Sequence, residues 1–356
     1  MTDQETRKKK LYVLFGASIV FLIIGLALMN RNADTNPNTG QTTTKTNTKP
    51  RNTEYVKNKR QKSAFFKKLK RALRNAKRVT TLDLGGFSLQ DLPEEITKLK
   101  NLEKLHLVGN NFTTLPEVIT RLPNLTELSL ADNQLTTLPA SLKNLTKLKT
   151  LHLSGNHFTT LPEVVTELPQ LTFCSLADNQ LTTLPKSFGK LQNLEVLILS
   201  RNKFQELPES MGSLKNLTTL RANENQLFTL PDSLSTLKKL STLYIEKNQL
   251  TVLPDSIGQL SGLRNFRLAR NQLSALPESF GQLKNLRSLD FSKNSFTDFP
   301  EALVKLTKLE NLSLRANKIE EFPKDIKKMR GLRTVYVSTR QQKETLRELL
   351  PDCSVF

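Results

Sequence analysis

The chain has 356 residues, with 53 lysines and arginines against 33 aspartates and glutamates, and a formal net charge of +20. Residues 1–78 contribute 19 of the basic and 4 of the acidic side chains, so 15 of the 20 excess charges precede residue 79. The remaining chain is close to charge balance, which argues against a protein devoted to binding nucleic acid.

The first 29 residues combine a basic start with an apolar stretch. Residues 11–29, LYVLFGASIVFLIIGLALM, carry no charge over nineteen positions, close to the ~20 residues with which a helix crosses a bilayer. We expect a transmembrane signal-anchor there; the alternative is a cleaved signal peptide, whose apolar region is usually shorter. The basic cluster at 7–10, within a tail at 1–10, favours a cytoplasmic N-terminus, with the remaining chain periplasmic or extracellular.

Residues 30–53 are rich in threonine and asparagine and contain almost nothing apolar. Such a composition cannot bury enough surface to fold, so we expect a disordered stalk. Residues 54–78 differ, because apolar residues recur at helical spacing among lysines and arginines. This pattern predicts a basic amphipathic helix that caps the segment after it, and residues 57–78 could also contact an anionic surface. Its expected apolar face comprises Phe65, Phe66, Leu69, Ala72, Leu73 and Ala76.

A 23-residue pattern occurs about twelve times over residues 79–337, and this period indicates a solenoid in which each unit stacks on its neighbours. One copy consists of Leu102, Leu105, Leu107, Asn110, Phe112, Leu115 and Pro116. Leu105 and Leu107, two positions apart, predict a strand with one buried face. The proline prevents a long helix from starting before it, and Ile119 with Leu122 predicts a short helical or 3-10 turn that covers the strand.

An asparagine follows ten consecutive predicted strands, at the place where the chain must turn. Its amide both donates and accepts hydrogen bonds, so a column of them can satisfy the turning backbone of neighbouring coils. This expected structural ladder comprises Asn110, Asn133, Asn156, Asn179, Asn202, Asn225, Asn248, Asn271, Asn294 and Asn317.

These residues resemble the leucine-rich repeat family, whose pattern L-x-x-L-x-L-x-x-N-x-L they match almost letter for letter. The second half, L-P-x-x-I/L-x-x-L, is most similar to intracellular Ras-group repeats and to many bacterial surface repeat proteins. The resemblance covers residues 79–337. It implies an α/β solenoid, a right-handed horseshoe with a parallel inner sheet, and a role in binding other proteins.

The end of the chain departs from the repeat, and residues 338–356 are expected to form a C-terminal cap. Residues 341–350 predict a short helix that buries Leu346, Leu349 and Leu350 and stops at Pro351. The two cysteines, Cys174 in the fifth copy and Cys353 in this cap, are about seven strand steps of ~4.8 Å apart, too far for a disulfide.

No motif in the chain predicts catalysis. It lacks a nucleophile elbow, a phosphate-binding glycine loop and a metal-spaced Cys/His set. His106 and His152 occupy equivalent strand positions two copies apart, about 10 Å, too wide for one zinc ion. We therefore expect neither an enzyme nor a metal or cofactor.

The residues between the strand leucines are expected to point into solvent from the inner, concave face. Exposed apolar groups beside arginine and tyrosine are typical of binding hot spots. We predict that the centre of the ligand site consists of Phe173, Val196, Ile198, Arg221, Tyr244 and Arg267. A secondary basic strip, suited to an acidic partner or an anionic glycan, comprises Lys247, Arg264, Arg270, Arg287, Arg315 and Arg333.

The sequence thus predicts a single-pass membrane protein whose concave face binds a protein, or a glycan, outside the cytoplasm. Two other functions remain open. One is a membrane-tethered intracellular scaffold for signalling, similar to the Ras-group proteins. The other is a non-catalytic accessory subunit of an enzyme complex. Ligand, organism and oligomeric state do not follow from the residues.

Overall fold

The computed structural model describes residues 59–356. The predicted basic tail at 1–10, membrane anchor at 11–29 and stalk at 30–53 lie outside the described residues, as does the start of the capping segment at 54–58. Within residues 59–356, no helix combines the length and the apolar character that a bilayer crossing demands.

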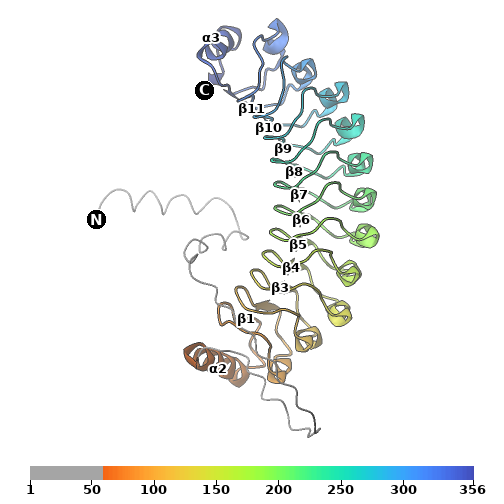
Figure 1. Ribbon diagram of the computed structural model, residues 1–356, viewed down its shortest axis with the longest axis vertical. Helices are drawn as coiled ribbons and strands as arrows, with labels where there is room; N and C mark the ends of the chain where they lie inside the picture. The colour runs from red at the N-terminus through yellow and green to blue at the C-terminus, as the bar shows by residue number, and fades with distance from the viewer. Residues whose placement is uncertain (1–58) are drawn as a thin grey trace, which may run out of the picture. The chain divides into compact units, whose positions relative to one another are not determined.

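One sheet of thirteen parallel strands runs through the described residues, in simple sequence order. The first twelve strands pair in register with partners 23 residues apart, as Leu105 does with Leu128. This confirms the predicted stack of coils, which curves with the strands on its concave side (Figure 1). The strands are β1 (Thr81–Asp83), β2 (Lys104–His106), β3 (Glu127–Ser129), β4 (Thr150–His152), β5 (Phe173–Ser175), β6 (Val196–Ile198), β7 (Thr219–Arg221), β8 (Thr242–Tyr244), β9 (Asn265–Arg267), β10 (Ser288–Asp290), β11 (Asn311–Ser313), β12 (Thr334–Tyr336) and β13 (Ser354–Val355).

Each of the first twelve strands buries its middle residue, because side chains alternate between the two faces of a sheet. Leu105 is fully buried and so is Leu107, just past the strand, whereas Lys104 is exposed and His106 only half-buried. The buried residues of all coils form one continuous hydrophobic core. No coil encloses a core alone, so stability comes from stacking.

The convex side carries one 3-10 helix per coil, each starting directly after a proline (Figure 1). In the second copy Pro116 is followed by η3, which buries Ile119 against the strand side, and Leu122 closes the turn with a backbone bond to Ile119. The 3-10 helices are η2 (Glu94–Lys98), η3 (Glu117–Arg121), η4 (Ala140–Asn144), η5 (Glu163–Glu167), η6 (Lys186–Lys190), η7 (Glu209–Ser213), η8 (Asp232–Thr236), η9 (Asp255–Gln259), η10 (Glu278–Gln282), η11 (Glu301–Lys305) and η12 (Lys324–Lys328).

Each repeated asparagine links its own coil to the preceding one. Asn202 accepts a hydrogen bond from Leu181 N–H in the preceding coil at 2.9 Å. Its amide donates to Leu176 O at 2.9 Å and to Leu199 O at 3.0 Å. The same bonds recur along the column, and only its last two members, Asn294 and Asn317, are partly exposed.

Helix α2 (Lys59–Arg74) covers the first coil. Phe65, Leu69 and Ala72 are buried against it, and the Phe65 ring lies 6.1 Å from that of Phe87. The expected apolar face was wrong in one respect, because Phe66 is 40% exposed. One residue past Phe65 is about 100° further round the helix, which turns Phe66 away from the coil.

Helix α3 (Arg340–Leu349) begins at Thr339, whose side chain forms a capping box with Gln342. Leu346 and Leu350 are buried, whereas Leu349 is half-buried. After the helix the chain adds strand β13, which pairs with β12 and which the repeat pattern did not predict. The C-terminal cap is therefore a helix and a strand, so the final edge of β12 is covered by backbone hydrogen bonds.

Candidate binding surface

The last residues of consecutive strands form a column on the concave face, because parallel pairing in register places equivalent positions side by side. Ile198 pairs with Arg221, Arg221 with Tyr244, and Tyr244 with Arg267. Val196 and Phe173 lie two positions earlier on β6 and β5 and pair with each other. The structure thus brings all six predicted central residues onto five adjacent strands.

The Tyr244 ring lies between two guanidinium groups. Arg267 Cζ is 4.5 Å and Arg221 Cζ is 5.4 Å from the ring centroid. Both arginines are exposed, while Tyr244 is half-buried between them. Arg267 Nη1 also lies 3.6 Å from Glu246 Oε1. Contact with an aromatic face restricts long side chains, so the Tyr244 ring favours this arrangement of the two arginines without a ligand.

The apolar part of the column is less open than its residue types suggest. Phe173, Val196 and Ile198 are all half-buried. The Phe173 ring packs 4.7 Å from the ring of His152 on the preceding strand. Burial of the His152 imidazole lowers its pKa from the ordinary value, outweighing the attraction of Glu127. These side chains therefore form a flat apolar surface beside the arginines and do not project far into solvent.

A compact polar group lies at the start of the concave face. Glu127 accepts a hydrogen bond from Lys104 and contacts His106 Nε2 at 2.9 Å. Burial alone would raise the pKa of Glu127, but these two partners hold it below its ordinary value. No set of three or more metal-ligating side chains comes together among residues 59–356.

The predicted basic strip is not one strip, and the structure divides it between two edges of the sheet. Arg264, Arg287 and Arg333 directly precede their strands, whereas Lys247 and Arg270 follow theirs. Arg315 lies on the turn that follows β11, two residues after the strand ends. These residues share only their basic side chain, and five intervening positions of the 23-residue period separate the two edges. Arg287 also pairs with Glu310 at 2.5 Å, which neutralises part of its charge.

The edge that follows the strands has a left-handed backbone. Non-glycine residues with positive φ recur there in successive copies: Asp178, Arg201, Glu224, Lys247, Arg270 and Lys293, with φ between 54° and 58°. Consecutive members pair with opposite charges, Arg201 with Asp178, and Lys247 with Glu224 at 3.3 Å. The glycines at the same place in the first copies, Gly109 and Gly155, adopt the same conformation.

A shallow hollow of about 270 Å³ on the concave face extends the column toward the C-terminus. Arg267 borders it on one side, and Arg315 lies 4.9 Å over the Tyr336 ring on the other. Tyr336 in turn stacks on Phe356 at 5.5 Å. Ser288, Asp290, Asn311 and Ser313 line its floor. Sequence reasoning missed this hollow, although Asp290, Ser313 and Tyr336 continue the periodic column beyond Arg267.

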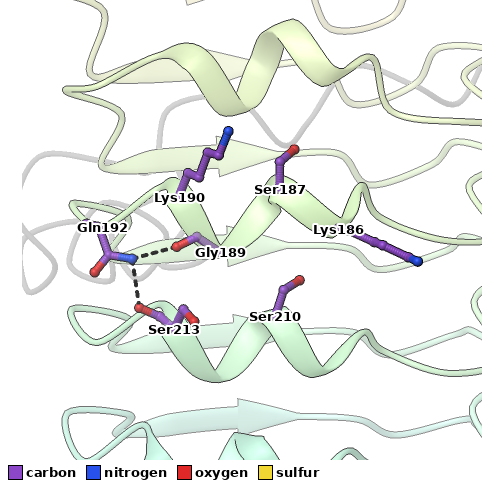
Figure 2. Close-up of a pocket in the computed structure, with 7 residues that line it drawn as sticks. All are labelled: Lys186, Ser187, Gly189, Lys190, Gln192, Ser210 and Ser213. Carbon is purple, nitrogen blue, oxygen red and sulfur yellow. Dashed lines mark hydrogen bonds between the residues drawn. The ribbon is translucent and has the colours of Figure 1, made fainter.

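A second, wide-open depression of about 520 Å³ lies on the convex side, between η6 and η7. Figure 2 shows Gln192 bridging the carbonyl oxygens of Gly189 and Ser213 across the two coils. Lys186, Lys190 and small hydroxyl side chains line the rest. None of the predicted binding residues lies there, and its lining holds the coils together.

Comparison with known families identifies the repeat. The family model described as "Leucine-rich repeat region" matches residues 67–173, 163–248 and 233–354. The chain belongs to the leucine-rich repeat family. The resemblance expected from the L-x-x-L-x-L-x-x-N-x-L pattern is therefore confirmed. None of the curated proteins compared with this leucine-rich repeat chain matches it.

Solved leucine-rich repeat structures are similar to it. An internalin (inlF) of Listeria monocytogenes is 22% identical over 85% of this chain and 95% of its own, with a TM-score of 0.65. The functional domain of InlJ from the same organism is 28% identical over 75% of this chain and 55% of its own, with a TM-score of 0.62. The plant peptide hormone receptor RGFR1 in complex with RGF2 is 26% identical over 70% of this chain and 49% of its own, with a TM-score of 0.50.

Proposed function

We propose that this leucine-rich repeat protein is anchored in a membrane by residues 11–29 and binds a protein ligand, outside the cytoplasm, through its concave face. Its role is recognition and not catalysis. The observation that supports the proposal is the arginine–tyrosine–arginine group on β7, β8 and β9, where the Tyr244 ring lies 5.4 Å and 4.5 Å from two guanidinium groups.

Tyrosine and arginine are the residue types that dominate binding energy at protein interfaces, since they combine large contact area with directional hydrogen bonding. Here the two arginines are exposed, and both guanidinium carbons lie over one ring. Half-buried Ile198 and Val196 border this group on the neighbouring strand. An apolar border limits water access to the polar centre, which strengthens each contact made there.

A protein ligand is favoured over a small molecule because the column spans many strands and the hollows along it are shallow. The similarity to RGFR1, a receptor whose structure holds a peptide hormone, supports the same class of ligand. Location outside the cytoplasm is supported by the apolar stretch at 11–29 and by the basic cluster before it.

The binding proposal is tested by placing a photo-crosslinking amino acid at Thr219, which precedes Arg221 on β7. The matched control carries the same amino acid at Ser213 on the convex face. We expect crosslinked partner protein from Thr219 only, and loss of the adduct when Arg221→Glu and Tyr244→Ala are added. Equal crosslinking at both positions, or an adduct that survives the double substitution, would move the ligand away from the concave face.

The location is tested separately on intact cells with a cysteine added after Phe356 in a Cys353→Ser background. A membrane-impermeant maleimide should label this cysteine without permeabilisation. Labelling that requires permeabilised cells would support the intracellular scaffold instead. If the partner crosslinked at Thr219 proves to be an enzyme that co-purifies in fixed stoichiometry, the chain is an accessory subunit.

A further inference from the structure

We infer that the outward face of helix α2 is a docking surface for anionic phospholipid headgroups, separate from the concave binding face. Helix α2 has eight lysines and arginines among its sixteen residues, KRQKSAFFKKLKRALR, and no acidic residue. Capping the first coil uses one side of this helix. Four of its charges, on Lys67, Lys70, Arg71 and Arg74, lie on the other side.

The orientation of α2 is fixed by contacts with the first coil. Phe65 is fully buried next to Phe87, and Lys68 Nζ lies 3.6 Å from Asp83 Oδ2 and 5.7 Å from the Phe87 ring. Gln61 donates a hydrogen bond to Gly86 O at 3.3 Å. With these side chains turned inward, the opposite face of the helix must point into solvent.

That outward face presents uncompensated positive charge. Lys67, Lys70, Arg71 and Arg74 are exposed. No carboxylate among residues 59–356 lies within ion-pair distance of these four side chains, although Lys68 next to them does pair with Asp83. Phe66, 40% exposed, borders the same face.

The other cap shows that capping does not require this charge. Helix α3 also covers an end of the array, and it too buries one apolar side, with Leu346 at its centre. Its sequence RQQKETLREL balances three basic residues with two glutamates, and Arg340 pairs with Glu344 at 2.8 Å. A solvated cap can therefore carry mixed charge, and the one-sign face of α2 has a cause other than capping.

Anionic lipid fits this face better than nucleic acid does. Interfacial helices combine lysines and arginines on the polar side with an aromatic residue that enters the headgroup boundary, which is the arrangement of Phe66 beside Lys70. Fewer than thirty residues separate the apolar stretch at 11–29 from Lys59. A membrane anchor there would hold α2 close to lipid, where weak electrostatic contacts become effective.

The test uses tryptophan fluorescence, because the chain contains no tryptophan. The full chain with Phe66→Trp is combined with vesicles of phosphatidylcholine alone, or of phosphatidylcholine with phosphatidylglycerol. Phe228→Trp is the matched control, since Phe228 is 48% exposed on a middle coil. We expect a blue shift and quenching by brominated acyl chains for Trp at position 66, only with phosphatidylglycerol. Raising salt from 0.1 M to 1 M shortens the screening length from about 10 Å to about 3 Å and should reverse both signals.

A pair of charge variants separates α2 from net charge. In the Phe66→Trp chain, changing Lys67, Lys70, Arg71 and Arg74 to Gln should remove most of the blue shift and the quenching seen with anionic vesicles. Changing Lys318, Lys324, Lys327 and Arg330 to Gln removes the same charge from the last coils and should leave both signals nearly unchanged. Circular dichroism checks that both variants remain folded, and Gln preserves helix propensity.

Three results would overturn the inference. They are the same emission at position 66 in both kinds of vesicle, an equal loss of the blue shift in the two charge variants, and a change in emission on adding single-stranded RNA without one on adding anionic vesicles. If a charge variant fails to fold, the Phe66→Trp chain with its lysines and arginines intact still tests the inference, by comparison of the two kinds of vesicle. This comparison applies whether or not residues 11–29 insert into the bilayer.

Discussion

Asn133 Oδ1 accepts a hydrogen bond from the backbone N–H of Phe112 at 3.1 Å, although 21 residues separate the two in the chain. The Asn133 amide group also donates to Leu107 O of the preceding coil and to Leu130 O of its own, both at 3.0 Å. One side chain therefore satisfies a donor and two acceptors of turning backbone. The bond between coils lies inside the core, where water cannot replace it.

The first prediction concerns this ladder. Asn202→Ala leaves Leu181 N–H without its partner. Leu176 O and Leu199 O lose one hydrogen bond each but still accept one from Asn179 and from Asn225. We expect a loss of about 1–3 kcal/mol in the free energy of unfolding, the usual cost of one buried unsatisfied group. Asn193→Ala is the control, because its exposed amide makes one bond to Pro169 O, and it should cost less than about 1 kcal/mol. Urea denaturation measures both, and equal losses would contradict the role of burial.

The second prediction concerns the convex side, where glycines allow the 3-10 helices to approach closely. A Cβ at Gly212 would lie 2.6 Å from Ser233 O and from Ser233 Cβ, in the next coil. Gly212→Ala should therefore destabilise the protein by about 1–3 kcal/mol through overpacking.

Gly281→Ala is the matched comparison for that substitution. Its Cβ would meet the flexible Lys305 side chain at 2.8 Å, and Ala302 O at 3.0 Å, so it should be tolerated better. The thermal unfolding midpoints of the two variants are compared. A lower midpoint for Gly281→Ala than for Gly212→Ala would show that the contact with Ser233 is not what restricts the residue at position 212.

The third prediction concerns thiol chemistry. Complete burial raises the pKa of the Cys174 thiol to about 12. Cys353 is only partly buried; burial also raises its pKa, against the effect of a backbone hydrogen bond at Val335. Only the thiolate reacts with disulfide reagents. At about pH 8, 5,5′-dithiobis(2-nitrobenzoate) should label Cys353 in the folded protein, and Cys174 only after unfolding.

Cys174 also makes stability depend on alkaline pH. Its thiol binds a proton more tightly in the folded state than in the unfolded chain, whose value is near 9.0. This contribution is complete below about pH 9 and is lost as the pH rises toward about 12. Cys174→Ala should flatten the decline in that interval. Rapid labelling of Cys174 in the native protein would contradict its burial.

The fourth prediction concerns acid. Burial beside Phe173 lowers the pKa of His152 below the ordinary 6.5, so the folded state favours the neutral ring. The stability that this provides is present above about pH 6.5 and is lost as the pH falls below it. His152→Gln should reduce the difference in denaturation midpoint between about pH 7.5 and pH 5.5. His157→Gln, at an exposed position, is the control, and an equal effect from it would refute the assignment.

The 23-residue period was enough to predict the strands, their register and the asparagine contacts, because each copy repeats the same local geometry. The same period placed Arg221, Tyr244 and Arg267 side by side. It could not predict β13, because Ser354 pairs with Thr334 only 20 residues earlier and lies outside the pattern. The cap residues do not repeat the 23-residue pattern, so their structure does not follow from it.

Side-chain depth was the other limit. Residue type marked Phe173 as exposed, but its depth is decided by its contact with His152 on the adjacent strand. Residue type likewise joined Arg264 and Lys247 in one strip, although one lies before its strand and the other after. Position within the 23-residue copy, and not residue type, decides on which edge of the sheet a basic residue lies.

In the left-handed turn after each strand, the backbone conformation does not depend on which side chain is present. Asp178, Arg201, Glu224 and Lys247 occupy the same conformation with φ between 54° and 58°. Sheet register and the asparagine bonds impose this conformation, at a cost of about 1–2 kcal/mol per non-glycine residue. Acidic and basic residues are therefore interchangeable along this rim without disturbance of the interior. A new sequence of charges, and with it a different specificity, needs only substitutions at every twenty-third residue.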